Sequence, residues 1–301
     1  MHVAVMGAGS VGSLVGGLLS IPHDVTLVAR EPHVRAVARD GLRITGLVDR
    51  RVHPAATTDW AAVDRADLAV VTVKTYDTAT AADELATAPP PVVLTLQNGM
   101  GTVGTLRNRL PPATTVLAGT CTYGARLESP GTVACTGHGE IRIGHPGRST
   151  HPVVDQTARA FAAAPLDAAG VTDVTRRRWE KLAINAAINP VTALARVRNG
   201  YVCEPPLWPA ARAAAEEAVD AAADAGVSLH RGDTVDRVKR VAAATAENES
   251  SMARDLRRGR RTEIDAIAGH VIDTADGPTP INGLLYALVK GYEIGADAGS
   301  A

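Results

Sequence analysis

Three polar side chains stand four residues apart in an otherwise apolar stretch: Lys181, Asn185 and Asn189. At that spacing all three lie on one face of a helix. A desolvated ammonium can release a proton near neutral pH, whereas a guanidinium cannot. The chain has only four lysines against 27 arginines, so a lysine here is unusual. The pattern predicts a proton-transfer site lined by two carboxamides. The alternative is a lysine that reaches solvent and two asparagines that bond nearby backbone.

A glycine-rich segment near the N-terminus supplies a second set of candidate residues. An apolar strand at 2–6 precedes it, and a helical pattern and a second strand at 25–28 follow it. In this setting G-x-G-x-x-G lets backbone amides approach a pyrophosphate, and the helix dipole stabilises the anion. We therefore expect a dinucleotide site here rather than a signal peptide, a membrane span or a nucleophile elbow. Its residues are Gly7, Ala8, Gly9, Ser10, Val11 and Gly12.

Polar residues also follow the later strands, at the edge where open α/β sheets bind ligands. Arg30 follows the second strand and offers a bidentate donor to a 2′-phosphate, which favours NADP(H). Glu31 beside it leaves NAD open. Lys74 and Asn98 follow the strands near 69–73 and 92–96. The alternative for Asn98 is an ordinary Asn-Gly turn.

The pattern of elements changes midway along the chain. The first part alternates β-branched runs with helical patterns, as a parallel sheet covered on both faces does. After about residue 175 strand signals nearly vanish. We predict an α/β chain with an N-terminal Rossmann-like parallel sheet domain over 1–170 and an all-helical C-terminal domain over 171–301. Two strand-like pieces near 131–136 and 140–144 are expected to form a hairpin. Helices are expected at 32–40, 77–87, 102–110, 176–195, 206–225, 234–247, 261–273 and 282–292.

Composition disfavours several classes of partner. A formal net charge of −1 and 3% aromatic residues provide neither a field nor a stacking platform for nucleic acid. The arginine runs at Arg176–Arg178 and Arg254–Arg261 are expected to be solvated helix faces. Three widely spaced cysteines form no disulfide framework, and nine histidines show no metal-ligand spacing. We therefore expect a cytoplasmic protein with no metal, no membrane partner and a small-molecule substrate, and a homo-oligomer stays open.

Taken together, these motifs resemble the ketopantoate reductases, also called 2-dehydropantoate 2-reductases, over nearly the whole chain. The resemblance implies a Rossmann domain, a helical C-terminal domain, and reduction of ketopantoate by NADPH in pantothenate biosynthesis. The matching segments are the glycine loop, Lys74, Gln97–Gly101, Gly119–Arg126, Lys181–Asn185, Ile188–Leu194, Glu249–Met252 and Thr262–Asp265.

The resemblance also implies roles for single residues. Lys181 would donate the proton to the keto oxygen, and Arg30 would hold the 2′-phosphate. The other residues lining the cofactor would be Lys74, Asn98, Ala125 and Glu263. The keto acid would be held by Asn98, Lys181, Asn185, Asn189, Asn199 and Ser251. The alternatives are a surface carboxylate for Glu263 and a helix-start hydroxyl for Ser251.

Two features depart from the family's pattern. The segment 265–285 is shorter than the family's, and Tyr123 stands where a smaller or imidazole side chain can occur. The identity of the keto acid therefore stays open. The alternatives are an NADP-dependent reductase of another 2-keto acid, an opine-forming or hydroxy-acid dehydrogenase, and a non-catalytic dinucleotide-binding regulator. A regulator would need no proton donor, which argues against it.

Overall fold

The computed structural model describes the backbone of residues 1–298 and the side chains of residues 1–295. Contacts divide the chain into two compact units. The first, the sheet unit, contains residues 1–97 and 102–175, and the second, the helical unit, contains residues 98–101 and the chain from Arg176 onward. The predicted fold class, a Rossmann-like sheet domain followed by a helical domain, is confirmed.

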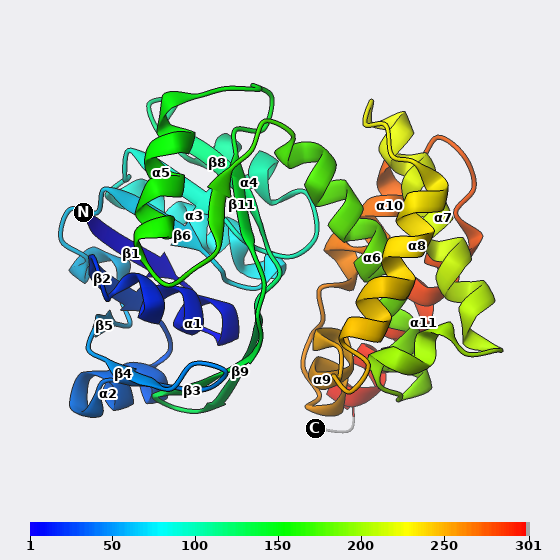
Figure 1. Cartoon of the computed structure of the whole chain (residues 1–301), viewed down its shortest axis with the longest axis horizontal. Helices are drawn as coiled ribbons and strands as arrows, with labels where there is room; N and C mark the ends of the chain where they lie inside the picture. The colour runs from blue at the N-terminus through cyan, green and yellow to red at the C-terminus, as the bar shows by residue number, and fades with distance from the viewer. Residues whose placement is uncertain (299–301) are drawn as a thin grey trace. The chain divides into compact units, whose positions relative to one another are not determined.

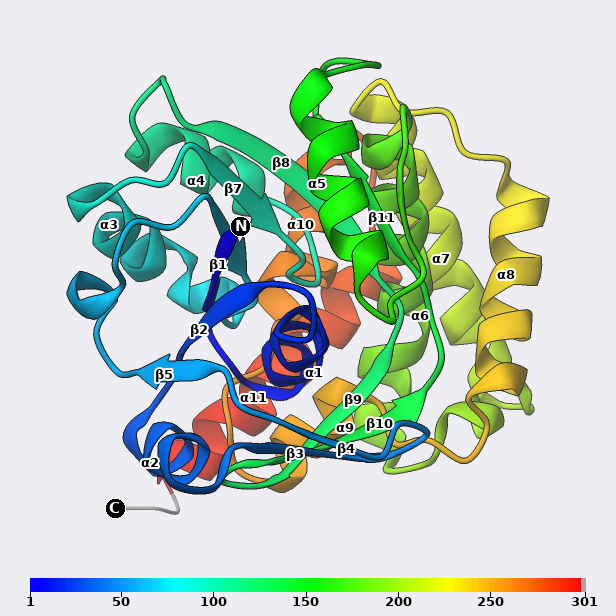
Figure 2. The ribbon, with the colours of Figure 1, turned by 60° about the vertical axis from the view of Figure 1, so that its left-hand side comes forward.

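The sheet unit is built on an eight-stranded sheet with the order β12-β11-β8-β7-β6-β1-β2-β5 (Figures 1 and 2). Neighbouring strands pair in parallel except for β11 and β8. The strands are β1 (His2–Met6), β2 (Asp24–Val28), β5 (Ala55–Thr57), β6 (Leu68–Val71), β7 (Val92–Thr95), β8 (Thr115–Cys121), β11 (Ile141–Gly144) and β12 (Ala168–Gly170).

Helices cover both faces of this sheet (Figures 1 and 2). Successive residues of β1 point to opposite sides, so Val3 and Val5 join one apolar core and Ala4 and Met6 join another. Burial on both sides explains why the strands are continuous apolar runs in the sequence. One core includes α1 (Ser10–Leu19) and α5 (Pro152–Ala163), the other includes α3 (Thr78–Thr87) and α4 (Thr102–Arg109), and α2 (Glu31–Asp40) follows β2.

A second sheet of four strands has the order β4-β3-β10-β9. Its strands are β3 (Leu42–Gly46), β4 (Arg50–Val52), β9 (Gly124–Ser129) and β10 (Thr132–Gly137). The predicted hairpin is wrong, because β10 pairs with β3 and β9 whereas β11 pairs with β8 and β12. The two neighbouring strand patterns had suggested mutual pairing, but β10 forms its hairpin with β9, the strand just before it, and β11 pairs with β8 and β12 of the other sheet.

The helices of the helical unit (Figure 1) pack around two apolar clusters. One includes Ala183, Ala218 and Val289, and the other includes Ala187, Ala211 and Val238. The helix predicted over 261–273 is wrong in its first half, because a short 3-10 turn at Ile264–Ala266 precedes the α-helix there. The helices are α6 (Val174–Ala195), α7 (Leu207–Asp224), α8 (Arg231–Ala244), α9 (Ser251–Arg257), α10 (Ala268–Thr274) and α11 (Pro280–Ala298).

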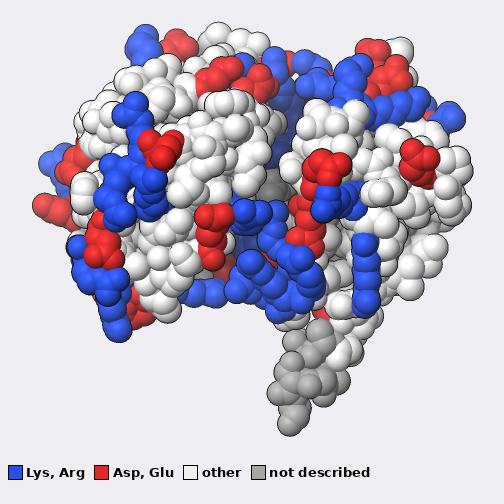
Figure 3. Space-filling view, turned by 60° about the horizontal axis from the view of Figure 1, so that its bottom comes forward, with Lys and Arg blue, Asp and Glu red and all other residues white. Residues whose placement is uncertain are grey.

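The described helices and side chains were considered for two kinds of site, a membrane span and a metal centre. None of the described helices combines the length and hydropathy that a membrane span requires. Nor do the described residues gather three His, Cys, Asp or Glu side chains into a group that could hold a metal ion. On the face shown in Figure 3, basic side chains gather in the lower middle with acidic ones at their margins, and the two signs are mixed elsewhere. The candidate catalytic and cofactor-binding residues lie at strand ends and on helix faces.

Candidate active site

A polar face runs along α6, and it is longer than the sequence ladder. Arg178, Lys181, Asn185 and Asn189 follow one another at spacings of three and four residues, which places them on one side of the helix. Arg178 is only 7% exposed and Asn189 only 8%, while Lys181 and Asn185 are half-buried. The helix expected for the ladder is present, and the side chains on this face are largely withdrawn from water.

The first side chain of this face, Arg178, corrects a prediction. The run Arg176–Arg178 was expected to be solvated, but only Arg176 is exposed, where it pairs with Glu180. Arg178 donates from Nη2 to the carbonyl oxygen of Gly99, 3.1 Å away. Burial lowers the pKa of Arg178 to about 10, so it stays charged at neutral pH. Its helical spacing from Lys181 was the sequence signal that could have found it.

The loop at 98–101 follows β7 along the chain but makes its contacts in the helical unit. The N–H of Met100 donates to the carbonyl oxygen of Ala266, 3.0 Å away. Gly99 has φ +74°, and a Cβ there would lie 2.5 Å from that same carbonyl oxygen. With Arg178 bonded to Gly99, the loop is held at two points. Asn98, its first residue, is half-buried.

The C-terminal part of the α6 polar face approaches the start of α9. The hydroxyl of Thr192, three residues after Asn189, lies 2.9 Å from the hydroxyl oxygen of Ser250. Ser250 also caps α9, because its Oγ accepts the N–H of Ala253 at 3.1 Å. The helix-start role proposed as an alternative for Ser251 therefore belongs to its neighbour. Ser251 is the first residue of α9 and is half-buried.

Asn199 lies in a 3-10 turn and is bonded to the end of α8. Its Nδ2 donates to the hydroxyl of Thr245 at 3.0 Å, and its backbone N–H donates to the carbonyl oxygen of Asn248 at 3.0 Å. Its side-chain oxygen is buried, and among the described residues it has no hydrogen-bond partner. The Nδ2 of Asn199 is therefore bonded within the protein, while its Oδ1 is not, among the described residues.

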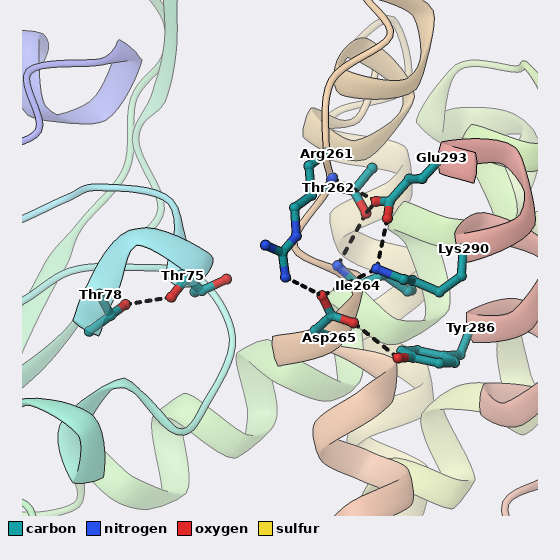
Figure 4. A network of polar contacts seen from close by, with 9 residues as sticks. All are labelled: Thr75, Thr78, Arg261, Thr262, Ile264, Asp265, Tyr286, Lys290 and Glu293. Atoms are coloured by element: carbon teal, nitrogen blue, oxygen red, sulfur yellow. Dashed lines mark hydrogen bonds and ion pairs between the residues drawn. The ribbon is translucent and has the colours of Figure 1, made fainter. Parts of the chain in front are cut away.

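Glu263 is only 7% exposed, so the alternative of a surface carboxylate is wrong. Its neighbours on both sides are fixed by side chains of α11 (Figure 4). Thr262 donates from its N–H and its hydroxyl to Glu293 Oε1, both at 2.7 Å. Asp265 is held by three side chains, Tyr286 at 3.1 Å, Arg261 at 3.1 Å and Lys290 at 3.5 Å. These contacts fix the backbone that carries Glu263.

In the sheet unit, the glycine loop has the geometry that an anion site needs. Gly7 has φ +98°, and a Cβ there would lie 2.6 Å from the backbone nitrogen of Val73. A Cβ on Gly12 would collide with the carbonyl oxygen of Gly7, whereas one on Gly9 would meet nothing closer than 4.0 Å. Gly9 also precedes α1 without a side-chain cap, so first-turn amides can receive an anion. These residues fit a pyrophosphate.

A buried histidine supports this loop. The N–H of Gly131 donates to Nδ1 of His33 at 3.1 Å, so the proton of the neutral ring is on Nε2. Nε2 lies 3.1 Å from the hydroxyl of Ser13, which in turn donates to the carbonyl oxygen of Ala8 at 2.9 Å. Burial lowers the pKa of His33 and so favours this neutral form. The hydroxyl of Ser10 accepts the N–H of Leu127 at 3.0 Å, which ties the loop to β9 as well.

Of the other predicted cofactor residues of this unit, Arg30 and Lys74 follow β2 and β6 of the main sheet, and Ala125 lies in the second sheet. The side chain of Arg30 is 93% exposed and lies 3.9 Å from the carboxylate of Asp77. Lys74 precedes the 3-10 turn that ends at Asp77. Ala125 lies in β9 opposite Cys135.

Tyr123, the residue that departs from the family's pattern, has its hydroxyl committed to the backbone. The oxygen accepts the N–H of Asp167 at 2.8 Å. The bond directs the hydroxyl toward the residue that precedes β12.

One supporting residue of the sheet unit was missed in the sequence. The buried Gln97 donates from Nε2 to the carbonyl oxygen of Val73 at 3.0 Å and to the hydroxyl of Thr78 at 2.8 Å. Its Oε1 accepts the hydroxyl of Thr95 at 3.0 Å. Gln97 therefore fixes the backbone just before Lys74. A polar residue at the end of a buried strand was the signal.

Comparison with known proteins identifies relatives over the whole chain. A model of the family "Ketopantoate reductase PanE/ApbA" matches residues 3–148, and the model of that family's C-terminal part matches residues 173–293. A 2-dehydropantoate 2-reductase of Halobacterium salinarum is 41% identical, over 96% of this chain and 98% of the relative. The protein of the same name from Archaeoglobus fulgidus is 39% identical over 98% of each chain.

Solved structures give the same picture. A ketopantoate reductase family protein of Ralstonia eutropha superposes with a TM-score of 0.90 at 34% identity, over 99% of this chain and 100% of the other. A D-mandelate dehydrogenase solved with NADH and anilino(oxo)acetate superposes with a TM-score of 0.92 at 21% identity, over 99% of this chain and 100% of the other. At that identity the second likeness concerns the fold alone.

We predict that Gly99→Ala destabilises the protein more than Gly101→Ala does. Both glycines have positive φ, +74° and +83°, so both substitutions add backbone strain of about 1–2 kcal/mol. Only the methyl group at 99 would also press on the carbonyl oxygen of Ala266, because nothing lies within 4 Å at 101. Denaturant unfolding measures the difference. Equal losses of unfolding free energy would show that the loop is not held against Ala266.

Proposed function

Because the chain belongs to the ketopantoate reductase family, it is an oxidoreductase that acts on a CH–OH group, and we propose that it reduces ketopantoate to pantoate with NADPH, a step of pantothenate biosynthesis. The resemblance seen in the sequence is thereby confirmed at the level of the family. The observation that supports the reaction is the α6 polar face, which presents Lys181 between a buried arginine and two asparagines.

When bound, the nicotinamide supplies a hydride to the ketone carbon, and the protein has to supply a proton to the ketone oxygen. In this proposal Lys181 donates it, and the support is that Lys181 is the lysine of the α6 polar face and is half-buried. Asn98 and Asn185 donate hydrogen bonds to the charge that develops on that oxygen. The remaining substrate contacts in this proposal are Asn189, Asn199 and Ser251.

The cofactor of the family is a nicotinamide dinucleotide, and in our proposal residues 1–170 supply most of the contacts to it while residues 171–301 supply most of the contacts to the substrate. The glycine loop binds the pyrophosphate through backbone amides. Arg30 binds the 2′-phosphate; its pairing with Asp77 is long and exposed, so little stability is lost when the guanidinium turns to a phosphate. The other cofactor contacts are Lys74, Asn98, Ala125 and Glu263.

The first prediction concerns the substrate. With NADPH as donor, kcat/KM should be highest for ketopantoate among a panel of branched 2-keto acids, measured by the loss of NADPH absorbance. A higher value for another keto acid would establish the alternative reductase on the same fold. If NADPH binds but no keto acid is reduced, the chain is a dinucleotide-binding regulator and the proposal fails.

The second prediction concerns the cofactor. Arg30→Ala should weaken NADPH by about 1–3 kcal/mol, because a charge-assisted bond to the 2′-phosphate is lost, and should leave NADH nearly unchanged. Arg35→Ala is the matched control, since Arg35 is an exposed arginine of α2 paired with Glu31. Fluorescence titration of both nucleotides gives the affinities. Equal weakening of NADPH and NADH by Arg30→Ala would show that Arg30 does not touch the 2′-phosphate.

The third prediction concerns the proton. Lys181→Ala should lower kcat by about 10²–10⁴-fold, the usual contribution of general acid catalysis. Lys181→Arg should also lower kcat, because a guanidinium does not release its proton and is a poor substitute for the compact charge of an ammonium. NADPH titration is the control, since the glycine loop is untouched. Near-normal turnover in Lys181→Ala would assign the proton to water or to another group.

A further inference from the structure

We infer that Arg178 is a positioning residue for the reduction, which holds the backbone of the loop at 98–101 and thereby fixes the carboxamide of Asn98 beside Lys181. This inference rests on the proposed function, since it assigns Asn98 to the same substrate oxygen as Lys181. Arg178 itself need not touch the substrate. Three observations within the helical unit support it.

The first observation is the hydrogen bond that the buried guanidinium of Arg178 makes to the loop. A buried guanidinium is costly unless its N–H groups are bonded. Arg178 is 7% exposed, and one of its bonds goes to the carbonyl oxygen of Gly99 at 3.1 Å. A bond from a charged donor is stronger than one between neutral groups. Arg178 is therefore an anchor for this loop.

The second observation is that both ends of one peptide group are bonded. The carbonyl of Gly99 and the N–H of Met100 belong to the same peptide plane. Arg178 bonds the carbonyl, and the backbone of Ala266 bonds the N–H at 3.0 Å. A plane held at both ends resists rotation, which restricts the backbone just after Asn98. Ala266 alone would leave the carbonyl end free to turn.

The third observation is the register on α6. Arg178 precedes Lys181 by three residues, which is about 4.5 Å along the helix axis and the same face. The guanidinium that bonds the loop carbonyl and the ammonium of Lys181 therefore leave α6 on the same face, one turn apart. Asn98 comes one residue before that carbonyl, and in the proposed function it meets the keto oxygen together with Lys181.

The test is a double-mutant cycle between Arg178→Met and Asn98→Ala. Methionine fills much of the arginine's space without donating. We expect Arg178→Met alone to lower kcat for ketopantoate by about 10–100-fold, the loss that a displaced catalytic group causes. If Arg178 acts through Asn98, adding Arg178→Met to Asn98→Ala should change kcat by no more than about twofold. Effects that multiply in the double variant would overturn the inference.

Three controls keep the outcomes separate. Arg176→Met, which removes an exposed arginine of the same run, should leave kcat and KM unchanged. Thermal unfolding shows whether each variant is folded. If Arg178→Met does not fold, Arg178→Gln, whose side chain is neutral and shorter, replaces it in the cycle. A folded Arg178 variant that keeps wild-type kcat and KM has lost only a structural bond, and the inference is wrong. If the wild type reduces no keto acid, the proposed function fails first.

Discussion

A helix that carries an arginine, a lysine and two asparagines on one side cannot press that side into an apolar core, because each unpaired polar group would cost about 1–3 kcal/mol. The polar face of α6 sets this constraint for the helical unit. The opposite side of α6, which carries Leu182 and Ala183, packs into the apolar core. The polar side is met instead by backbone and hydroxyl groups, from the loop at 98–101 at one end and from Ser250 at the other. The elements around the candidate site therefore follow from what this face needs.

The sheet unit obeys a different constraint. Because apolar helices cover both faces of its main sheet, polar groups can gather only where the strands end. The glycine loop, Arg30, Lys74 and Gln97 all stand at such ends. Supporting bonds from His33 and Gln97 hold the backbone at these positions, so the atoms available to a ligand are backbone amides in a fixed arrangement. A dinucleotide site of this kind depends more on main-chain geometry than on any one side chain.

Local patterns predicted the features that local chemistry determines. The glycine loop, the helix carrying Lys181 and the four apolar strands expected at 2–6, 25–28, 69–73 and 92–96 were all placed correctly from spacing and composition. The hairpin at 131–144 was not, because β10 pairs with β9, the strand just before it, and with β3, while β11 joins β8 and β12 of the main sheet. Arg178 was misjudged because arginine runs are usually solvated. Arg178 is instead buried, and it bonds the carbonyl of Gly99, which lies 79 residues earlier in the chain. For Glu263, the burial of the side chain excludes the surface alternative, and its contact with the cofactor stays a prediction.

The central claim is that Lys181 delivers the proton to the substrate oxygen, and a ternary structure tests it most directly. Crystals with NADP⁺ and pantoate would show the hydroxyl oxygen that forms when the ketone is reduced. The account predicts that Lys181 Nζ lies about 2.6–3.2 Å from that oxygen, the range over which a general acid can act. Asn98 Nδ2 should bond the same oxygen. A lysine that bonds only the carboxylate of pantoate, with a water at the hydroxyl, would contradict the account.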